Sequence, residues 1–146
     1  MKGEEIVLLI FANLIIAVIL ATIIQGLVIY FKQKRYEKLY PVYFENLKKH
    51  NEAMSKSCDF WNKKILPLRN EIKSFQEDKI YYTKEKWIEK EIELEEIKKE
   101  LEVLEQEYSK LENEIDTYYS IMKQEIESDK KFKNFMIKND FWREIV

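Results

Sequence analysis

The chain has 146 residues, of which 46% are hydrophobic and 36% are charged, and it carries a net charge of −2 with only two glycines and two prolines. Because turn-forming residues are this scarce, the sequence favours a small number of long helices. The predicted fold class is therefore all-α. Lysines and glutamates are interspersed along the charged part, so the sequence gives no electrostatic footprint for nucleic acid. Cys58 is the single cysteine, so an intramolecular disulfide is excluded, and we expect its thiol to fill a small space in the core.

The first element is an uncharged run from Ile6 to Phe31. As a helix it would be about 39 Å long at about 1.5 Å per residue, more than the roughly 30 Å of a bilayer core. A cleavable secretory signal fits less well, because its apolar core should have about 7 to 15 residues and end in a small-residue cleavage site. We therefore predict a single transmembrane helix over residues 6–31 that stays attached.

Basic residues flank this run unequally. Residues 32–40 form a basic juxtamembrane anchor that contains Lys32, Lys34, Arg35 and Lys38. Only Lys2 precedes the run, beside Glu4 and Glu5. Because Lys and Arg next to a span are preferentially kept on the cytosolic side, we predict that residues 1–5 lie outside and residues 32–146 lie in the cytosol, at the inner membrane.

A stripe of small and polar side chains recurs every four residues within the predicted span. Its members are Asn13, Ala17, Ala21 and Gln25. An amide that faced lipid would be unsatisfied, so Asn13 and Gln25 should turn toward another helix or toward water, unless both reach the headgroups from near the ends of the span. A single span has no second helix of its own, so we predict a homo-oligomer in which this stripe joins helices or lines a pore.

The chain beyond the span should stay helical to about Leu39, and Pro41 should introduce a kink or a new helix start. An apolar stripe at intervals of three or four residues follows. It contains Tyr36, Tyr40, Tyr43, Leu47, His50, Met54, Cys58, Trp61 and Ile65. Pro67 is expected to interrupt it before Leu68, Ile72 and Phe75 resume the pattern, and the polar residues 76–79 are the predicted hairpin turn.

The most regular pattern of the chain is a heptad seam of about four repeats. It consists of Leu94, Ile97, Leu101, Leu104, Tyr108, Leu111, Ile115, Tyr118 and Met122. Trp87 extends the seam backward, although Lys90 then occupies a seam position. Residues 41–128 are thus predicted to form a helical coiled-coil domain with a left-handed supercoil. The partner is either the preceding stripe, in an antiparallel helical hairpin, or another copy; the two seam tyrosines, whose hydroxyls must reach the rim, favour the hairpin.

Residues 129–146 are predicted to form an aromatic, amphipathic C-terminal helix. Its apolar residues are Phe132, Phe135, Met136, Phe141, Trp142 and Ile145. We expect this face to pack on the coiled coil. Contact with the anionic inner leaflet is the alternative, because lysines surround it at positions 130, 131, 133 and 138.

No catalytic, metal or cofactor site is predicted. The one histidine, His50, lies on the apolar stripe, where packing is the expected role, and neither a metal-binding Cys/His cluster nor a glycine-rich phosphate loop is present in the sequence. The run Arg69-Asn70-Glu71-Ile72-Lys73-Ser74 resembles the opening of the motif of the helical ribonucleases called HEPN. Ser74 stands where that family requires a histidine, so the catalytic group is missing.

Two non-enzymatic functions are compatible with this organisation. The first is a single-pass membrane protein that self-associates and scaffolds partners at the inner membrane face through its coiled coil; the partners expected are membrane lipid, further copies and a cytosolic protein. The second is a homo-oligomeric pore or membrane-disrupting effector, and small one-span effectors of bacterial antiviral defence are similar in outline. Phage inner-membrane spanins are also similar in having one span followed by a coiled coil, but they face outward.

Overall fold

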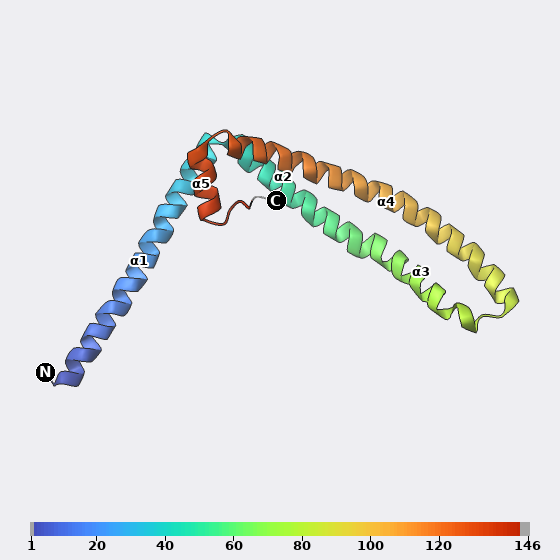
Figure 1. Cartoon of the computed structure of the whole chain (residues 1–146), viewed down its shortest axis with the longest axis horizontal. Coiled ribbons are helices and arrows are strands. Elements are labelled where there is room, and N and C mark those ends of the chain that lie inside the picture. Colours follow the sequence, from blue (N-terminus) through green and yellow to red (C-terminus); the bar gives the residue numbers. More distant parts are fainter. Residues whose placement is uncertain (1, 144–146) are drawn as a thin grey trace. The chain divides into compact units, whose positions relative to one another are not determined.

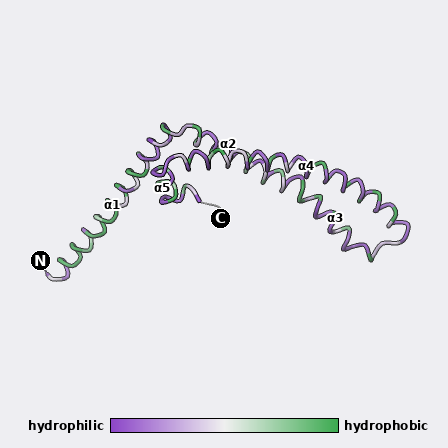
Figure 2. Tube along the Cα trace, turned by 45° about the horizontal axis from the view of Figure 1, so that its top comes forward, coloured by the Kyte–Doolittle hydropathy of each residue, from purple (hydrophilic) through white to green (hydrophobic). Residues whose placement is uncertain are grey.

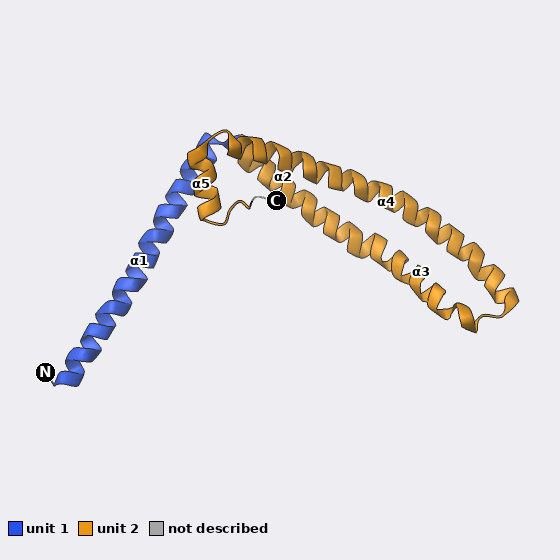
Figure 3. Cartoon of the chain, viewed as in Figure 1, with its two compact units in different colours: residues 1–41 blue, residues 42–146 orange. Residues whose placement is uncertain are grey.

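The computed structural model describes residues 2–143, and this range contains helices and no strand (Figure 1). The all-α prediction is therefore confirmed. The helices are α1 (Gly3–Leu39), α2 (Pro41–Phe60), α3 (Leu66–Asp78), α4 (Lys84–Glu127) and α5 (Lys130–Lys138), joined in part by a π-helical turn η1 (Trp61–Ile65) and a 3-10 turn η2 (Lys79–Tyr81). The chain divides into two compact units, Met1–Pro41 and Val42–Val146, which Figure 3 colours separately.

The first unit is one uninterrupted helix, α1, of 37 residues, and none of its residues is buried. Figure 2 shows that hydrophobic residues are concentrated in this helix. Among the helices described, α1 is the one that is long and apolar enough to span a membrane, by length and composition. It ends at Leu39 because Pro41 disfavours a helical conformation at the residue before it, and Tyr40 has φ −126°. The predicted helix end at Leu39 and the break at Pro41 are confirmed.

The second unit is held together by contacts between residues far apart in the sequence. In its middle, Trp61 packs against Tyr108, with ring centroids 5.2 Å apart. Near the η2 connection, Phe75 packs against Trp87 at 5.5 Å. Residues later in α2, η1 and α3 thus contact residues earlier in α4, so the two segments run in opposite directions.

The connection between these two segments lies later than predicted. Residues 76–78 still belong to α3, and the chain turns through η2, Tyr82 and Thr83. No glycine or proline interrupts α3 at residues 76–78, so this helix continues through the polar window. Thr83 begins α4 because its backbone is extended and its hydroxyl accepts a hydrogen bond from the Lys86 amide at 3.4 Å.

The helical run continues through Pro67, where the sequence predicts an interruption of the apolar stripe. The helix instead widens over the π turn η1, where the Leu66 amide donates to the Trp61 carbonyl, and α3 begins with proline in its first turn. A π turn inserts one extra residue into a helix. Because of this insertion, Pro67 lies in the first turn of α3. Its lack of a backbone N–H is tolerated there, since the first amides of a helix have no partner within the helix.

The inward face of α2 differs from the predicted stripe at two positions. Met54 is 43% exposed and Cys58 is exposed, so neither fills the core as expected. Small residues take the inward positions instead, and Ala53 and Ser57 are both buried. The reason is that Tyr43, Ala53 and Ser57 keep the heptad register of a regular helix, whereas steps of four residues through Met54 and Cys58 rotate away from α4.

A compact aromatic core closes the end of the unit where α2 begins and α4 ends. Its fully or almost fully buried members are Tyr43, Met122, Ile126, Phe132, Met136 and Trp142. The aromatic face of α5 therefore packs on the helical unit, as expected. The helix itself is shorter than the predicted 129–146, because Asp140 adopts φ 58° and reverses the chain; Ile145 lies outside the described residues.

Candidate functional site

The polar stripe of α1 is the first candidate surface. Asn13, Ala17, Ala21 and Gln25 are all exposed on the helix. Four residues correspond to slightly more than one helical turn, so each member is displaced by about 40° from the last, and the stripe winds slowly around α1. The neighbouring Thr22 satisfies its hydroxyl within the helix by donating to the Val18 carbonyl at 2.9 Å. The amide side chains of Asn13 and Gln25 are longer than the threonine side chain, and each has a carbonyl acceptor and an NH₂ donor. They can therefore form hydrogen bonds with a second helix.

The basic anchor continues the same helix. Lys32, Lys34, Arg35 and Lys38 lie in the last two turns of α1, where positive side chains also complement the helix dipole. Lys34 pairs with Glu37 at 3.0 Å, and its ammonium lies 5.7 Å from the centre of the Tyr30 ring. Tyr30 and Phe31 thus add aromatic groups at the boundary of the apolar run, which sequence reasoning did not single out although such residues are common at membrane interfaces.

The predicted heptad seam lies along α4, where Tyr108 contacts Trp61 of the opposing segment. Its nine residues, Leu94, Ile97, Leu101, Leu104, Tyr108, Leu111, Ile115, Tyr118 and Met122, are half-buried except for Met122, which is buried. Trp87 and Lys90 are half-buried too, and Lys90 pairs with Glu93 at 2.7 Å. The hydrogen bond and the charge of Glu93 raise the pKa of Lys90, so this lysine stays charged at the edge of the seam.

An aromatic and charged cluster lies halfway along the seam. Tyr108 contacts both Trp61 and Phe60, and the guanidinium of Arg69 lies 4.8 Å from the centre of the Trp61 ring. Arg69 also donates to Glu105 across the two segments. Sequence reasoning missed this pair, because Arg69 and Glu105 are distant in the chain and look like ordinary solvated charges. Arg69 thus combines packing on Trp61 with pairing to Glu105.

Two open grooves flank the seam in this region. One is lined by Phe60 and Leu111 together with charged residues that include Lys56, Lys63 and Glu107. The other is lined by Cys58, Trp61, Asn62, Tyr108 and Glu112. Apolar residues that line an open groove remain accessible to a further helix. Half-buried rings of the cluster therefore line both grooves.

The core at the base of the unit contains one unsatisfied polar group. Tyr43 is 0% exposed, and its ring has edge contacts with Phe132 at 5.3 Å and Trp142 at 6.3 Å. Within residues 2–143 its hydroxyl has no hydrogen-bond partner. Burial raises the pKa of Tyr43 to about 12. A buried hydroxyl without a partner lowers stability, so the apolar ring contacts hold Tyr43 in place.

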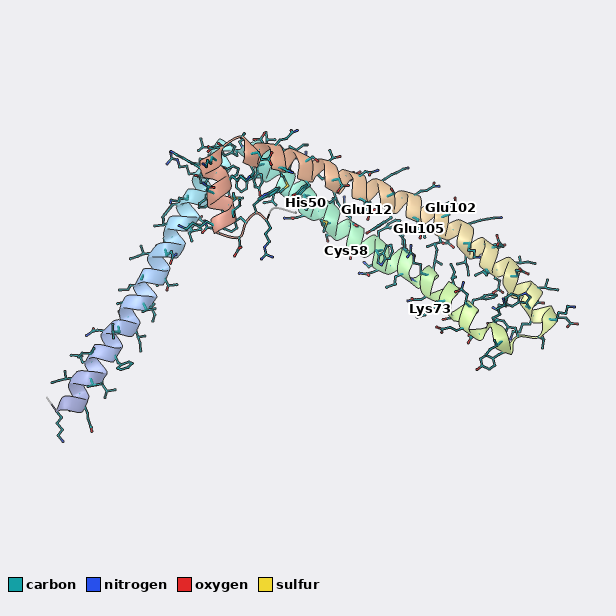
Figure 4. The ribbon with its side chains drawn as sticks, in the orientation of Figure 1. His50, Cys58, Lys73, Glu102, Glu105 and Glu112 are labelled. Carbon is teal, nitrogen blue, oxygen red and sulfur yellow. The ribbon has the colours of Figure 1, made fainter. Side chains whose placement is uncertain are left out.

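The reactive residue types are dispersed along the second unit. Figure 4 shows His50 and Cys58 on α2, Lys73 on α3, and Glu102, Glu105 and Glu112 at successive positions along α4. In residues 2–143 no three His, Cys, Asp or Glu side chains are grouped so that they could hold a metal ion.

Comparison with the models of known protein families, with curated proteins and with solved structures finds no match.

Proposed function

We propose that the protein is a non-enzymatic, single-pass membrane protein that self-associates and holds partners at the inner membrane face. The observation that carries the proposal is the apolar run of α1, an uncharged helical surface from Ile6 to Phe31 with no buried residue. Apolar surface of this length is stable only when it is covered. A lipid bilayer covers this surface. The helix can lie in lipid because its backbone hydrogen bonds are made within the helix.

The orientation belongs to the same proposal. The basic anchor follows the apolar run, and acidic residues Glu4 and Glu5 precede it. By the preference of basic flanks for the cytosolic side, residues 32–146 lie in the cytosol and residues 1–5 outside. The spanin-like function requires the opposite orientation.

The helical unit supports the scaffold function. We infer that α2, η1 and α3 form an antiparallel hairpin with α4, wound as a coiled coil about the heptad seam. A pair of helices buries only one face of each, which explains why the seam residues are half-buried. The two grooves beside Tyr108 and Leu111 accept further helices, either from another copy or from a cytosolic protein.

Native Cys58 provides the test of insertion and orientation, because it is exposed and is the only cysteine. In sealed right-side-out vesicles, a membrane-impermeant maleimide should leave Cys58 unlabelled until the membrane is permeabilised. The protein should also stay with the membrane in alkaline carbonate. Labelling in intact vesicles would contradict the orientation, and release without detergent would contradict the membrane function; Cys58→Ser is the labelling control.

Self-association is tested at the polar stripe of α1. The chain should have the mass of an oligomer in nanodiscs, and Asn13→Leu with Gln25→Leu should reduce its copy number. The matched control is Ile15→Leu with Ile23→Leu, which changes two positions outside the stripe without removing an amide. A monomeric unmodified chain, or equal loss in both variants, would contradict the proposal.

The alternative function is a homo-oligomeric pore, and the exposed amides Asn13 and Gln25 on one helix favour it. In this version the stripe faces water in the centre of an oligomer. Liposomes that contain the protein should then leak ions, and the Asn13→Leu, Gln25→Leu variant should seal them while it remains inserted. Scaffolding without a pore predicts tight liposomes with both proteins.

A further inference from the structure

The outer surface of α5 combines exposed lysines with exposed apolar side chains. The buried residues Phe132 and Met136 define the inward face of this helix. At about 100° per residue, the opposite face contains Lys130, Lys131, Asn134, Ile137 and Lys138, and all five are exposed. Beside it, Phe141 is 43% exposed and contacts Phe135, with ring centroids 6.1 Å apart.

The lysines of this face are exposed positive charges. In the part of the chain described, Lys130, Lys131 and Lys138 are in no ion pair. Within residues 129–143 the acidic residues are Asp129 and Asp140. Asp129 caps α5 by accepting from the amides of Lys131 and Phe132, at 2.8 and 3.4 Å. The basic face is therefore available for an anionic partner.

We propose that this face of α5 docks on the anionic headgroups of the membrane in which α1 is anchored, an inference that rests on the proposed function. The lysines attract anionic lipid headgroups. Ile137 and Phe141, which lie among these lysines, enter the interfacial layer of the membrane. Mixed basic and apolar side chains fit a headgroup surface better than an acidic protein groove, because the apolar residues lie among the charges and not on a separate stripe.

Two further observations select the membrane as the partner. The core of α5 packs on Tyr43, only twelve residues after the end of the apolar run, so the covalent chain keeps α5 close to the lipid. In contrast, α4 has more than twice as many acidic as basic residues and is repelled by an anionic surface. Docking through α5 therefore holds the base of the helical unit at the membrane while electrostatic repulsion keeps α4 away from it.

The test uses the full chain in nanodiscs with a fluorescent label at residue 134, introduced as Asn134→Cys in a Cys58→Ser background. A nitroxide on the lipid headgroup quenches labels that lie at the surface. We expect stronger quenching in discs with about 30% anionic lipid than in zwitterionic discs, and a decrease between about 0.05 and 0.5 M salt, because salt screens surface charge. A label at Glu89→Cys, in α4, is the positional control.

Charge reversal provides the decisive variant. Lys130→Glu, Lys131→Glu and Lys138→Glu together should lower the docking equilibrium at least a hundredfold, since each lysine near an anionic surface contributes about fivefold. Lys98→Glu, Lys99→Glu and Lys110→Glu change the net charge equally on α4 and should leave the quenching unchanged. If the α5 reversal prevents folding, Ile137→Gln and the salt titration provide the same test.

A failure of the proposed membrane function and a failure of α5 docking give different results in this experiment. A chain that does not enter nanodiscs overturns the proposed membrane function itself. A chain that enters them, but whose residue 134 is quenched equally in anionic and zwitterionic discs or is unaffected by the α5 reversal, overturns only the docking of α5. Crosslinking of residue 134 to a second copy in place of quenching also overturns it, because the face is then covered by protein.

Discussion

Trp61 packs against Tyr108 with ring centroids 5.2 Å apart, and its neighbour Phe60 reaches the same tyrosine at 6.4 Å. Consecutive residues of a regular α-helix point about 100° apart and do not share one partner in this way. The π turn that begins at Trp61 brings both rings toward α4. The register of the inward face thus shifts by one residue, from Tyr43, Ser57 and Phe60 before the turn to Trp61, Ile65 and later residues after it.

This register shift predicts that the chain tolerates a deletion in the π turn better than elsewhere. Removing Asn62 should convert η1 into regular helix, and Ile65 and the following inward residues then continue the heptad of α2. Removing Glu100 instead should rotate the rest of α4 by about 100° and expose its seam. Both deletions are made in a Pro67→Ala background, because proline within a regular helix costs about 3 kcal/mol by itself.

We expect the Asn62 deletion to retain a cooperative unfolding transition and the Glu100 deletion to lose it. The measurement is urea unfolding of the full chain in detergent micelles, followed by circular dichroism and tryptophan fluorescence. Similar losses for the two deletions would show that η1 is not a simple insertion.

The deviations from the sequence-based prediction come from features that an apolar pattern does not contain. Ala53 and Ser57 are small, so a search for large apolar residues preferred Met54 and Cys58, which have nearly the same spacing. Over the short stretch of α2 a step of four cannot be distinguished from the alternation of three and four. The regular seam of α4 gave no such choice, and its members are half-buried or, at Met122, buried.

The connections were harder to predict than the helices. Leu39 and Pro41 marked a helix end because proline acts through local sterics. Thr83 acts through a single hydrogen bond to the Lys86 amide, which a pattern of polarity does not reveal. The pair Arg69 and Glu105 requires knowledge of which residues face each other across the two segments. Predicting contacts between residues far apart in the sequence therefore required the exact register of the two segments.

The Arg69 cluster predicts unequal effects for its two charges. Both side chains are about half exposed, and exposed ion pairs contribute about 0.2 to 1 kcal/mol. Arg69 also stacks on Trp61, which adds about 0.5 to 1 kcal/mol. We expect Arg69→Ala to lower the free energy of unfolding by about 1 to 1.5 kcal/mol and Glu105→Ala by less than about 1 kcal/mol. A double-mutant cycle measures the coupling, and a larger effect of Glu105→Ala than of Arg69→Ala would contradict this account.

The buried hydroxyl of Tyr43 predicts that Tyr43→Phe stabilises the protein. The variant keeps the ring contacts with Phe132 and Trp142 and removes an unsatisfied group, which should raise the free energy of unfolding by about 1 kcal/mol. Fluorescence of Trp142, whose ring also stacks on Tyr119 at 5.2 Å, reports on this core during urea unfolding. No gain in the variant would mean that the hydroxyl is satisfied in solution.

The same substitution should show a pH dependence of definite sign. Burial raises the pKa of Tyr43 from 10.0 to about 12, so above pH 10 the unfolded chain loses its proton while the folded chain keeps it. Stability from the neutral phenol is complete below pH 10 and decreases as the pH rises toward 12. The difference in the free energy of unfolding between Tyr43→Phe and the unmodified protein should therefore increase by about 1 kcal/mol between pH 9 and 11. Comparing the two proteins at each pH cancels the titration of the lysines, and a constant difference would contradict the prediction.

Asp140 lies just after α5 and has a positive φ. Its φ of 58° lies in the left-handed region, where a residue with a Cβ is strained and glycine is not. The Phe141 amide donates to the Met136 carbonyl at 2.8 Å and the Asp140 amide to the Ile137 carbonyl at 3.2 Å, so Asp140 occupies the helix-ending position where glycine is preferred. Asp140→Gly should raise the free energy of unfolding by about 0.5 to 1 kcal/mol. Asp140→Ala is the matched control, because it removes the same carboxylate but keeps the Cβ, and urea unfolding should show no comparable gain. Equal stabilisation by both variants would assign the effect to charge and not to the backbone.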